Sequence, residues 1–330
     1  MLIDRHYAIF EWITGASRLH LMTDNDSIVS NFVTFDIEEW YHANYVGQAG
    51  SGEISSANLF ANVESLLDLC DEHKIRSTCF ILGCVARDKP EVVRLILDRG
   101  HEVASHGFNH ELIDKLTPVG FREDISKAKA ILEDIAGVVV RGYRAPSWSV
   151  TRQNMVWFYD TLAEAGYSYS SSVYPGRTHL FGIPGFPTFP HHPNLGEERT
   201  SILEIPHAMT TVCGKKIAFS GGFFLRLLPT EFIRRNIEQV NRKGLPVFIY
   251  LHPREIDVES PRLNLGLVNR FIHYYNIANT RDKLSGVMKG HKFILMKDYS
   301  VFDVARNSNK KSDKARSHTT DELESSSYEA

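Results

Sequence analysis

From about residue 31 to residue 302, short apolar segments alternate with amphipathic helical segments, and this alternation constrains the fold more than any other feature of the chain. Repeated strand–helix units favour a parallel sheet whose right-handed crossovers carry the helices. A chain of 330 residues with 43% hydrophobic content is long enough to form one such α/β barrel. Asn58 is predicted to cap the first long helix. The strands are predicted at residues 31–35, 77–82, 102–104, 138–140, 167–170, 202–205 and 246–251.

Three parts are expected along the chain. Residues 1–29 are predicted to be an N-terminal extension, and residues 30–304 to be the barrel with a C-terminal region at about 260–304. Residues 305–330 are almost free of apolar side chains, so we expect a disordered tail that cannot offset its ordering entropy.

Composition narrows the class of partner. A formal net charge of −3 carries no basic footprint for nucleic acid or for a membrane surface. No segment approaches the roughly 18 to 20 apolar residues of a membrane span, and charged residues interrupt every N-terminal run that could serve as a secretion signal. The four cysteines form no C-x-x-C motif and indicate reduced, packed thiols. We therefore expect a cytoplasmic protein with a carbohydrate or small-molecule substrate.

A pair of histidines four residues apart follows the predicted strand at 102–104. His106 and His110 would lie on one face of a helical turn, where both imidazoles can bind one Zn²⁺-like ion. The alternative for this pair on its own is two solvated surface histidines.

An acidic cluster ends the first predicted strand. Asp36 and Glu38 point to the same side if the chain stays extended, so one carboxylate could bind a metal while the other acts as a base. Solvated acids at a polar strand end are the alternative. Arg144 and His252 follow two later strands, so every chemically suggestive cluster lies at a carboxyl end, where the active site of a barrel is built.

The order of these motifs resembles that of the polysaccharide deacetylases with the NodB-type fold, carbohydrate esterase family 4. The resemblance is closest to the subgroup associated with exosortase and extracellular-polysaccharide loci. Proteins of this subgroup have a small C-terminal region, and residues 271–275 and 283–284 resemble it. It implies a distorted (β/α)7 barrel that binds Zn²⁺ or another divalent ion and hydrolyses an N-acetyl amide. The matching text lies at residues 34–40, 104–112, 143–150, 204–206, 221–229 and 250–257.

The resemblance also implies a role for each site residue. Asp36 would be the general base, Arg144 the residue that orients it, and His252 the general acid for the leaving amine. The metal ligands would be Glu38, His106 and His110. Substrate would contact the Ser147 backbone N–H at the oxyanion, and Trp148 and Leu251 around the acetyl methyl.

Three departures from the family pattern stand out. The inserted Ile37 makes Glu39 a competitor of Glu38 for the metal, and Gly107 stands where a serine or threonine is usual. Ser170 stands where the family usually has an aspartate that orients the acid histidine.

We expect a metal-dependent hydrolase that removes N-acetyl groups from an amino sugar of a bacterial surface polysaccharide or its precursor. A catalytically weak or inactive barrel that binds glycans is one alternative. A hydrolase of another small C–N amide is the other.

Overall fold

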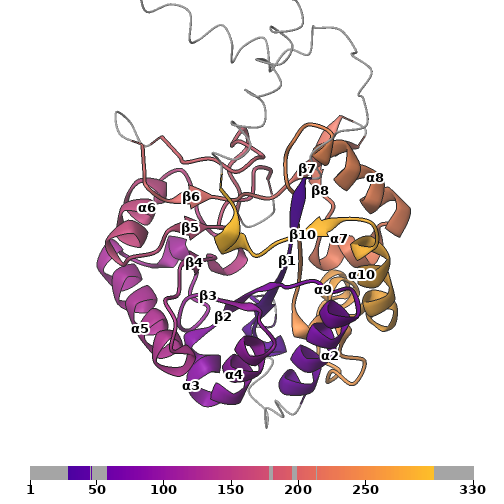
Figure 1. The fold of residues 1–330 in the computed structure, drawn as a ribbon, viewed down its shortest axis with the longest axis horizontal. Coiled ribbons are helices and arrows are strands. Elements are labelled where there is room, and N and C mark those ends of the chain that lie inside the picture. The colour runs from indigo at the N-terminus through magenta and orange to yellow at the C-terminus, as the bar shows by residue number, and fades with distance from the viewer. Residues whose placement is uncertain are drawn as a thin grey trace, which may run out of the picture.

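Parallel strands form one curled sheet in the computed structural model, which describes residues 29–44, 46, 58–177, 181–194, 199–212 and 214–300. Seven of its eight strands follow the order β10-β1-β2-β3-β4-β5-β6, and the eighth, β9, pairs with β1 (Figure 1). This confirms the predicted α/β class with a distorted parallel barrel, and the curled sheet closes incompletely. The strands are β1 (Ser30–Ile37), β2 (Thr78–Ile81), β3 (Glu102–Ser105), β4 (Gly142–Tyr143), β5 (Tyr169–Ser170), β6 (Leu203–Glu204), β9 (Phe248–Leu251) and β10 (Lys292–Phe293).

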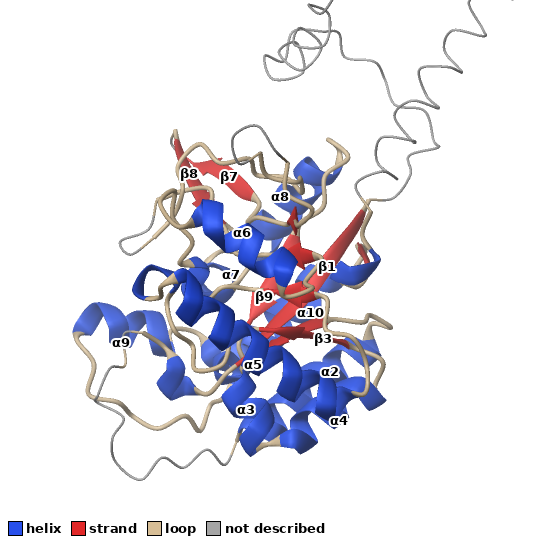
Figure 2. Ribbon diagram, turned by 90° about the vertical axis from the view of Figure 1, so that its left-hand side faces the viewer, coloured by secondary structure: helices blue, strands red, loops and turns tan. Residues whose placement is uncertain are grey.

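Helices cover the outer face of the sheet, because the crossovers between its parallel strands carry helices, except the crossover from β5 to β6, whose described residues form none (Figure 1). A separate antiparallel hairpin, β7 (Met209–Val212) with β8 (Lys215–Ala218), projects at the top of Figure 2. The helices are α2 (Leu59–Glu72), α3 (Gly83–Asp88), α4 (Pro90–Asp98), α5 (Pro118–Ala136), α6 (Met155–Glu164), α7 (Gly222–Leu227), α8 (Thr230–Asn241), α9 (Leu267–Tyr274) and α10 (Thr280–Met288).

Alternate residues of the strands face two different cores. In β1, Val33, Phe35 and Ile37 belong to the large core between the sheet and the helices. Phe32 belongs to a smaller cluster with Phe80, Tyr169 and Phe248 inside the curl of the sheet. By the twofold alternation of a strand, Asp36 shares the inner face with Phe32. The first acid of the motif is therefore aimed into the barrel.

One local prediction is wrong, and a second is confirmed only in part. Residues 138–140 form no strand; Val138 and Val139 are 51% and 66% exposed in the turn after α5, which ends at Gly137 in a left-handed conformation. The strand at this place is the short β4. Asn58 occupies the N-cap position of α2, as predicted, but its side chain accepts no hydrogen bond from the helix; its Nδ2 donates to Asp257 Oδ1 at 3.2 Å. The predicted N-terminal extension, apart from residue 29, and the predicted tail at 305–330 lie outside the described residues.

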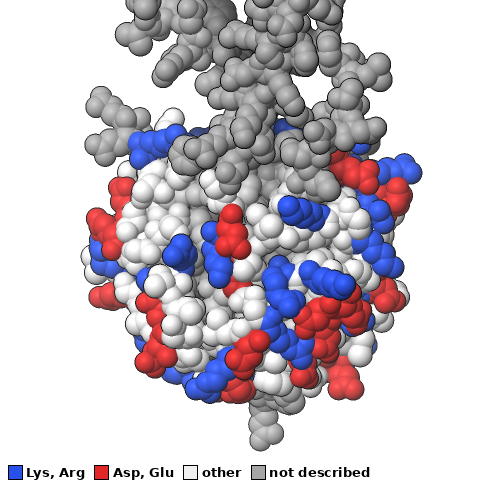
Figure 3. Space-filling view, viewed as in Figure 1, with Lys and Arg blue, Asp and Glu red and all other residues white. Residues whose placement is uncertain are grey.

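Charge is dispersed over the face seen in Figure 3, where Lys and Arg are interspersed with Asp and Glu. This pattern accords with the small net charge and offers no broad basic field on that face. Within the part of the chain that the structure describes, no helix is both long enough and apolar enough to span a bilayer.

The buried His101 is expected to make stability depend on pH. Its Nδ1 accepts the Ser77 backbone N–H at 2.9 Å, and burial, followed by nearby Arg76, lowers the pKa of His101 from 6.5 to about 4. Below pH 6.5, His101 therefore binds a proton in the unfolded chain but not in the folded chain. The free energy of unfolding falls as the pH is lowered, until the pH reaches the pKa of His101 in the folded chain. The loss assignable to this group is about 3 kcal/mol.

Denaturant unfolding of the wild type and of His101→Asn between pH 7 and pH 4 measures this effect. Asparagine keeps an acceptor near the Ser77 N–H and cannot titrate in this range. The variant is expected to lose less stability than the wild type as the pH falls. Parallel pH profiles would exclude His101 as the titrating group.

Candidate metal centre and active site

Three potential ligand atoms converge at the carboxyl ends of β1 and β3. One ligand atom each from Glu38, His106 and His110 lies within 4.8 Å of the other two. Glu38 Oε2 is 2.9 Å from His110 Nε2 and 3.9 Å from His106 Nε2. Two imidazoles and one carboxylate are a donor set that suits Zn²⁺ and similar divalent ions, and they leave further coordination positions for water and substrate. The residues present therefore fit the metal that the resemblance implies.

The surroundings of His106 prepare its Nε2 to bind a cation. His106 Nδ1 is 2.8 Å from the Arg144 carbonyl oxygen, so the ring donates from Nδ1 and leaves the lone pair on Nε2. Burial lowers the pKa of His106 to about 4, which keeps the imidazole neutral at physiological pH. Burial alone would raise the pKa of Glu38, but neighbouring His110 and His252 outweigh it and hold that pKa well below 4.5. The site thus offers neutral nitrogen and anionic oxygen, as a divalent cation requires.

The two histidines meet through a loop and not through the predicted helical turn. Residues after β3 up to the turn at Ile113–Lys115 form no helix, and both Gly107 (φ +79°) and His110 (φ +61°) are left-handed. A Cβ on Gly107 would come within 2.9 Å of Asp124 Oδ2, the oxygen that accepts the Phe108 N–H. Glycine at this position therefore permits the turn that brings His110 back to His106.

Glu38 and Glu39 have different partners. The Glu39 carboxylate is turned away from the histidines, and its Oε1 is 2.7 Å from Lys89 Nζ. Glu38 faces both histidines, as the alternation argument from the extended strand predicts. The geometry therefore favours Glu38 over Glu39 as the carboxylate ligand.

Asp36 lies beside this cluster in a buried ion pair. Its Oδ1 is 2.6 Å from Arg144 Nη1, with the two side chains 2% and 0% exposed. Arg144 is fixed in turn by the hydroxyls of Thr34 at 3.0 Å and Ser171 at 3.1 Å. One oxygen of Asp36 is thus held by the guanidinium, and its Oδ2 remains on the side of His252.

His252 completes the ring of groups from the end of β9. Its Nε2 is 4.0 Å from Asp36 Oδ2 and 3.5 Å from Glu38 Oε1. The fold therefore brings together all six residues assigned to catalysis and metal binding, although they come from positions 36 to 252 of the chain. The carboxyl ends of β1, β3, β4 and β9 account for this convergence.

Of the three residues predicted to contact substrate, Ser147 and Trp148 lie next to the site, but Leu251 does not face it. Ser147 and Trp148 have φ of +53° and +50°, so two successive non-glycine residues adopt the left-handed conformation next to the site. The side chain of Trp148 packs inside the barrel, whereas Leu251 is fully buried in the core between sheet and helices. Leu251 therefore does not line the interior. Its neighbour Tyr250 does, with its ring centroid 4.6 Å from that of Trp148.

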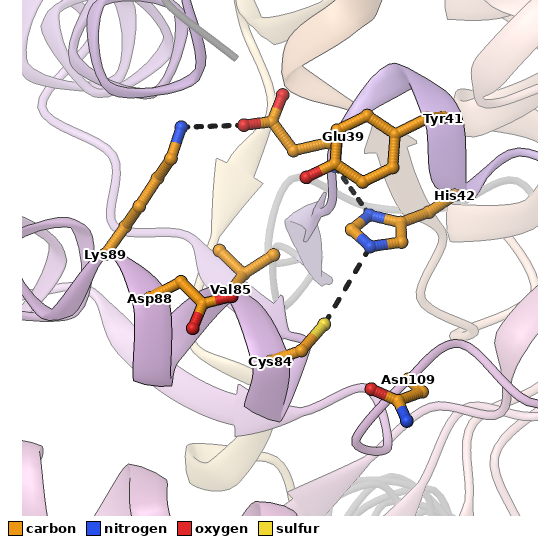
Figure 4. Close-up of a pocket in the computed structure, with 8 residues that line it drawn as sticks. All are labelled: Glu39, Tyr41, His42, Cys84, Val85, Asp88, Lys89 and Asn109. Carbon is orange, nitrogen blue, oxygen red and sulfur yellow. Dashed lines mark hydrogen bonds and ion pairs between the residues drawn. The ribbon is translucent and has the colours of Figure 1, made fainter. Parts of the chain in front are cut away.

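A pocket opens beside the metal centre (Figure 4). His42 Nδ1 accepts the Glu39 N–H at 3.0 Å, and the ring centroid of His42 is 6.4 Å from that of His110. An ion pair between the buried Glu39 and the partly exposed Lys89 crosses one side of the pocket (Figure 4). The remaining lining residues are Tyr41, Cys84, Val85, Asp88 and Asn109.

The sequence reasoning did not identify four side chains around the site. Arg254 Nε lies 3.8 Å from Glu38 Oε1, and Glu255 Oε2 lies 2.9 Å from His252 Nδ1. Arg226 holds the other oxygen of Glu255 at 3.0 Å, and His207 is buried between the rings of Trp148 and Phe248. Only Glu255 had a usable signal, since an acid three residues after His252 lies within one turn of it.

Two family models match consecutive parts of the chain. Residues 57–169 match the model described as polysaccharide deacetylase. Residues 171–301 match one described as a domain of unknown function, DUF3473. The first match covers less than half of the chain, and over that segment the chain is similar to the polysaccharide deacetylases. Among curated relatives, a peptidoglycan-N-acetylglucosamine deacetylase of Bacillus cereus is 28% identical over 92 residues, which cover 28% of this chain and 34% of the relative. A peptidoglycan deacetylase of Helicobacter pylori is 27% identical over 149 residues, 44% of this chain and 49% of the relative.

The matched segments thus span half or less of the length of these curated relatives.

Solved structures extend the likeness of fold over nearly the whole chain. A putative polysaccharide deacetylase from Mycobacterium smegmatis superposes with a TM-score of 0.55 at 19% identity, covering 89% of this chain and 95% of that one. PuuE allantoinase superposes with a TM-score of 0.54 at 17% identity, covering 88% and 94%.

The boundary between the two matches falls inside the sheet. The first match ends at residue 169 and the second begins at residue 171, whereas β5 spans Tyr169–Ser170. Strands β6, β9 and β10 belong to the second match. β6 pairs with β5, whereas β9 and β10 pair with β1, which precedes both matches. The C-terminal match is therefore part of the same sheet, and it contributes His252 to the site.

Proposed function

We propose that this chain is a metal-dependent hydrolase that removes N-acetyl groups from an amino sugar of a bacterial surface polysaccharide or its precursor. The observation that carries the proposal is the convergence of Glu38, His106 and His110 beside the Asp36–Arg144 pair, with His252 opposite. The relatives named as peptidoglycan deacetylases support the choice of an N-acetylated glycan. The exopolysaccharide setting rests on the motif resemblance.

Each residue near the site has chemistry suited to amide hydrolysis. Glu38, His106 and His110 would hold Zn²⁺ or a similar ion, which lowers the pKa of a bound water toward about 7 and polarises a carbonyl. Asp36 accepts the proton of the attacking water, while Arg144 keeps its carboxylate in place. The water oxygen forms a bond to the acetyl carbon.

Collapse of the tetrahedral state breaks the bond between carbon and nitrogen. His252 donates a proton to the departing amine, so that acetate and the free amino sugar leave. The Ser147 backbone N–H, presented by a left-handed residue, is suited to hold the oxyanion. Trp148 and Tyr250 supply an apolar wall for the methyl group, in the place first given to Leu251.

The pocket in Figure 4 is suited to the next sugar of a glycan. Glu39 and Lys89 present a carboxylate and an ammonium to hydroxyl groups, and Tyr41 offers an aromatic face. This pocket adjoins the metal centre through Glu39 and Asn109, the chain neighbours of Glu38 and His110.

Acetate release from N-acetylated substrates is the expected activity. The panel comprises chitooligosaccharides, peptidoglycan fragments and nucleotide-linked N-acetyl sugars, with allantoin and other small amides beside them. Chelation is expected to abolish acetate release, and readdition of Zn²⁺ to restore it, because the ion binds reversibly to deprotonated ligands.

Two outcomes would replace the proposal. Hydrolysis of the small amides alone would assign the site to another C–N amide. Saturable glycan binding with no acetate from any substrate, in protein shown to contain metal, would make the barrel a binding module.

A further inference from the structure

The imidazole of His252 has a carboxylate partner that the family pattern does not predict. Glu255 Oε2 is 2.9 Å from His252 Nδ1 and also accepts the His252 backbone N–H at 3.1 Å. Glu255 is the third residue of the short turn Pro253–Ile256, which begins directly after His252. The turn therefore folds the carboxylate back onto the ring.

Ser170, where the family usually has the orienting aspartate, is engaged elsewhere. Its hydroxyl donates to Ser172 Oγ at 2.8 Å, and that oxygen accepts the Ala145 N–H at 2.9 Å. Ser170 thus belongs to a network that joins the ends of β4 and β5. A hydroxyl tied in this way is not available to orient His252.

Arg226 holds Glu255 in place from the opposite side. Its Nε donates to Glu255 Oε1 at 3.0 Å, and both side chains are almost fully buried, at 1% and 2% exposure. Its other nitrogens donate to the carbonyls of Ile272 at 2.7 Å and Tyr275 at 2.6 Å. Burial alone would raise the pKa of Glu255, but Arg226, then His252, hold it far below 4.5, so the group is a carboxylate.

We propose that Glu255, clamped by Arg226, is the positioning residue of His252 and takes over the task of the aspartate that Ser170 replaces. The inference rests on the proposed function, in which His252 is the acid. A carboxylate at Nδ1 selects the tautomer with the proton on Nδ1 and directs Nε2 to the reacting groups. Here Nε2 faces Asp36 and Glu38. Arg254 Nη2 can only donate and would favour an unprotonated Nδ1, but it lies at 3.5 Å, whereas the Glu255 carboxylate is the closer partner at 2.9 Å.

The proposal assigns a task to the C-terminal match of unknown function. His252, Glu255, Arg226 and the carbonyls at the end of α9 all lie within residues 171–301. This region would supply the acid histidine together with its own orienting carboxylate and the arginine that anchors it. With Glu255 in this role, a serine at position 170 leaves the site with an orienting group for His252.

The test compares Glu255→Gln with the matched control Ser170→Ala in the metal-loaded protein. Glu255→Gln is expected to lower kcat by about 10²-fold, the upper end of the usual loss on removing an outer-shell partner, with KM and metal content unchanged. Ser170→Ala is expected to keep kcat within a few-fold of the wild type. Equal losses in the two variants, or a fully active Glu255→Gln, would overturn the proposal.

Two further measurements test the proposal if the Glu255→Gln variant fails to fold. Glu255→Asp keeps the charge beside Arg226 but shortens the reach, so kcat is expected to fall while KM stays unchanged. In the wild type, ¹⁵N chemical shifts are expected to show the neutral His252 ring protonated on Nδ1. A ring protonated mainly on Nε2 would refute the orientation, and this measurement holds even if no substrate is hydrolysed.

Discussion

Replacing Glu38 with glutamine is expected to remove the metal and, with it, all hydrolysis. Glu38 is the sole carboxylate in the ligand cluster found among the described residues, and its side chain is 2% exposed. An amide in its place would leave two histidines and no anionic ligand. The loss of metal affinity is expected to exceed the roughly 10- to 100-fold cost of disturbing a group outside the first coordination sphere.

Two neighbouring variants serve as matched controls for this prediction. Glu39→Gln alters the adjacent acid, which faces Lys89, and should keep its metal. Asp36→Asn should also keep its metal but lose about 10²- to 10⁴-fold in activity, the usual contribution of a general base. Metal content after dialysis, measured with acetate release, separates the three. A metal-loaded Glu38→Gln beside a metal-free Glu39→Gln would reverse the assignment.

Replacing Arg144 with methionine is expected to lower the free energy of unfolding by about 3 to 5 kcal/mol, because Asp36 would be left as an uncompensated buried charge. Arg144 is 0% exposed, and Asp36 Oδ1 lies 2.6 Å from its guanidinium. The same guanidinium lies 4.0 Å from the ring centroid of Phe80, so its removal also affects the inner cluster. Activity is expected to fall with stability, since the base would lose its orientation.

Denaturant unfolding of a double-mutant cycle measures this coupling. Asp36→Asn in the Arg144→Met background should restore part of the lost stability, because it removes the unpaired charge. A loss below about 1 kcal/mol in the single variant, as for an exposed ion pair, would contradict the buried-pair argument. Additive effects in the cycle would show that the two side chains are not coupled.

Much of the site could be predicted because its residues follow strand ends. Parallel strands bring their carboxyl ends to one rim, so Asp36, His106, Arg144 and His252 meet whatever the sequence distance between them. The alternation of side chains along a strand also predicted that Glu38, and not Glu39, would share the side of Asp36. These conclusions need only periodicity and topology.

The same alternation, followed through β9, excludes a residue that the resemblance suggested. Phe248 faces the barrel interior, so Tyr250 does too, whereas Leu251 faces the helices. In the motif around His252, the residue that lines the barrel interior is therefore Tyr250 and not Leu251.

By itself, the sequence determined the parallel α/β architecture, the rim on which the chemistry lies and the residue types available there. Only the tertiary structure decided how His110 returns to His106 through left-handed residues, and that Glu255 and Arg226 stand behind His252. Strand periodicity is a local property that the chain expresses in its pattern of apolar residues. Loop conformation and the pairing of buried charges depend instead on side chains that are distant in sequence, such as Asp124 beside Gly107 and Arg226 beside Glu255, and these meet only when the barrel has formed.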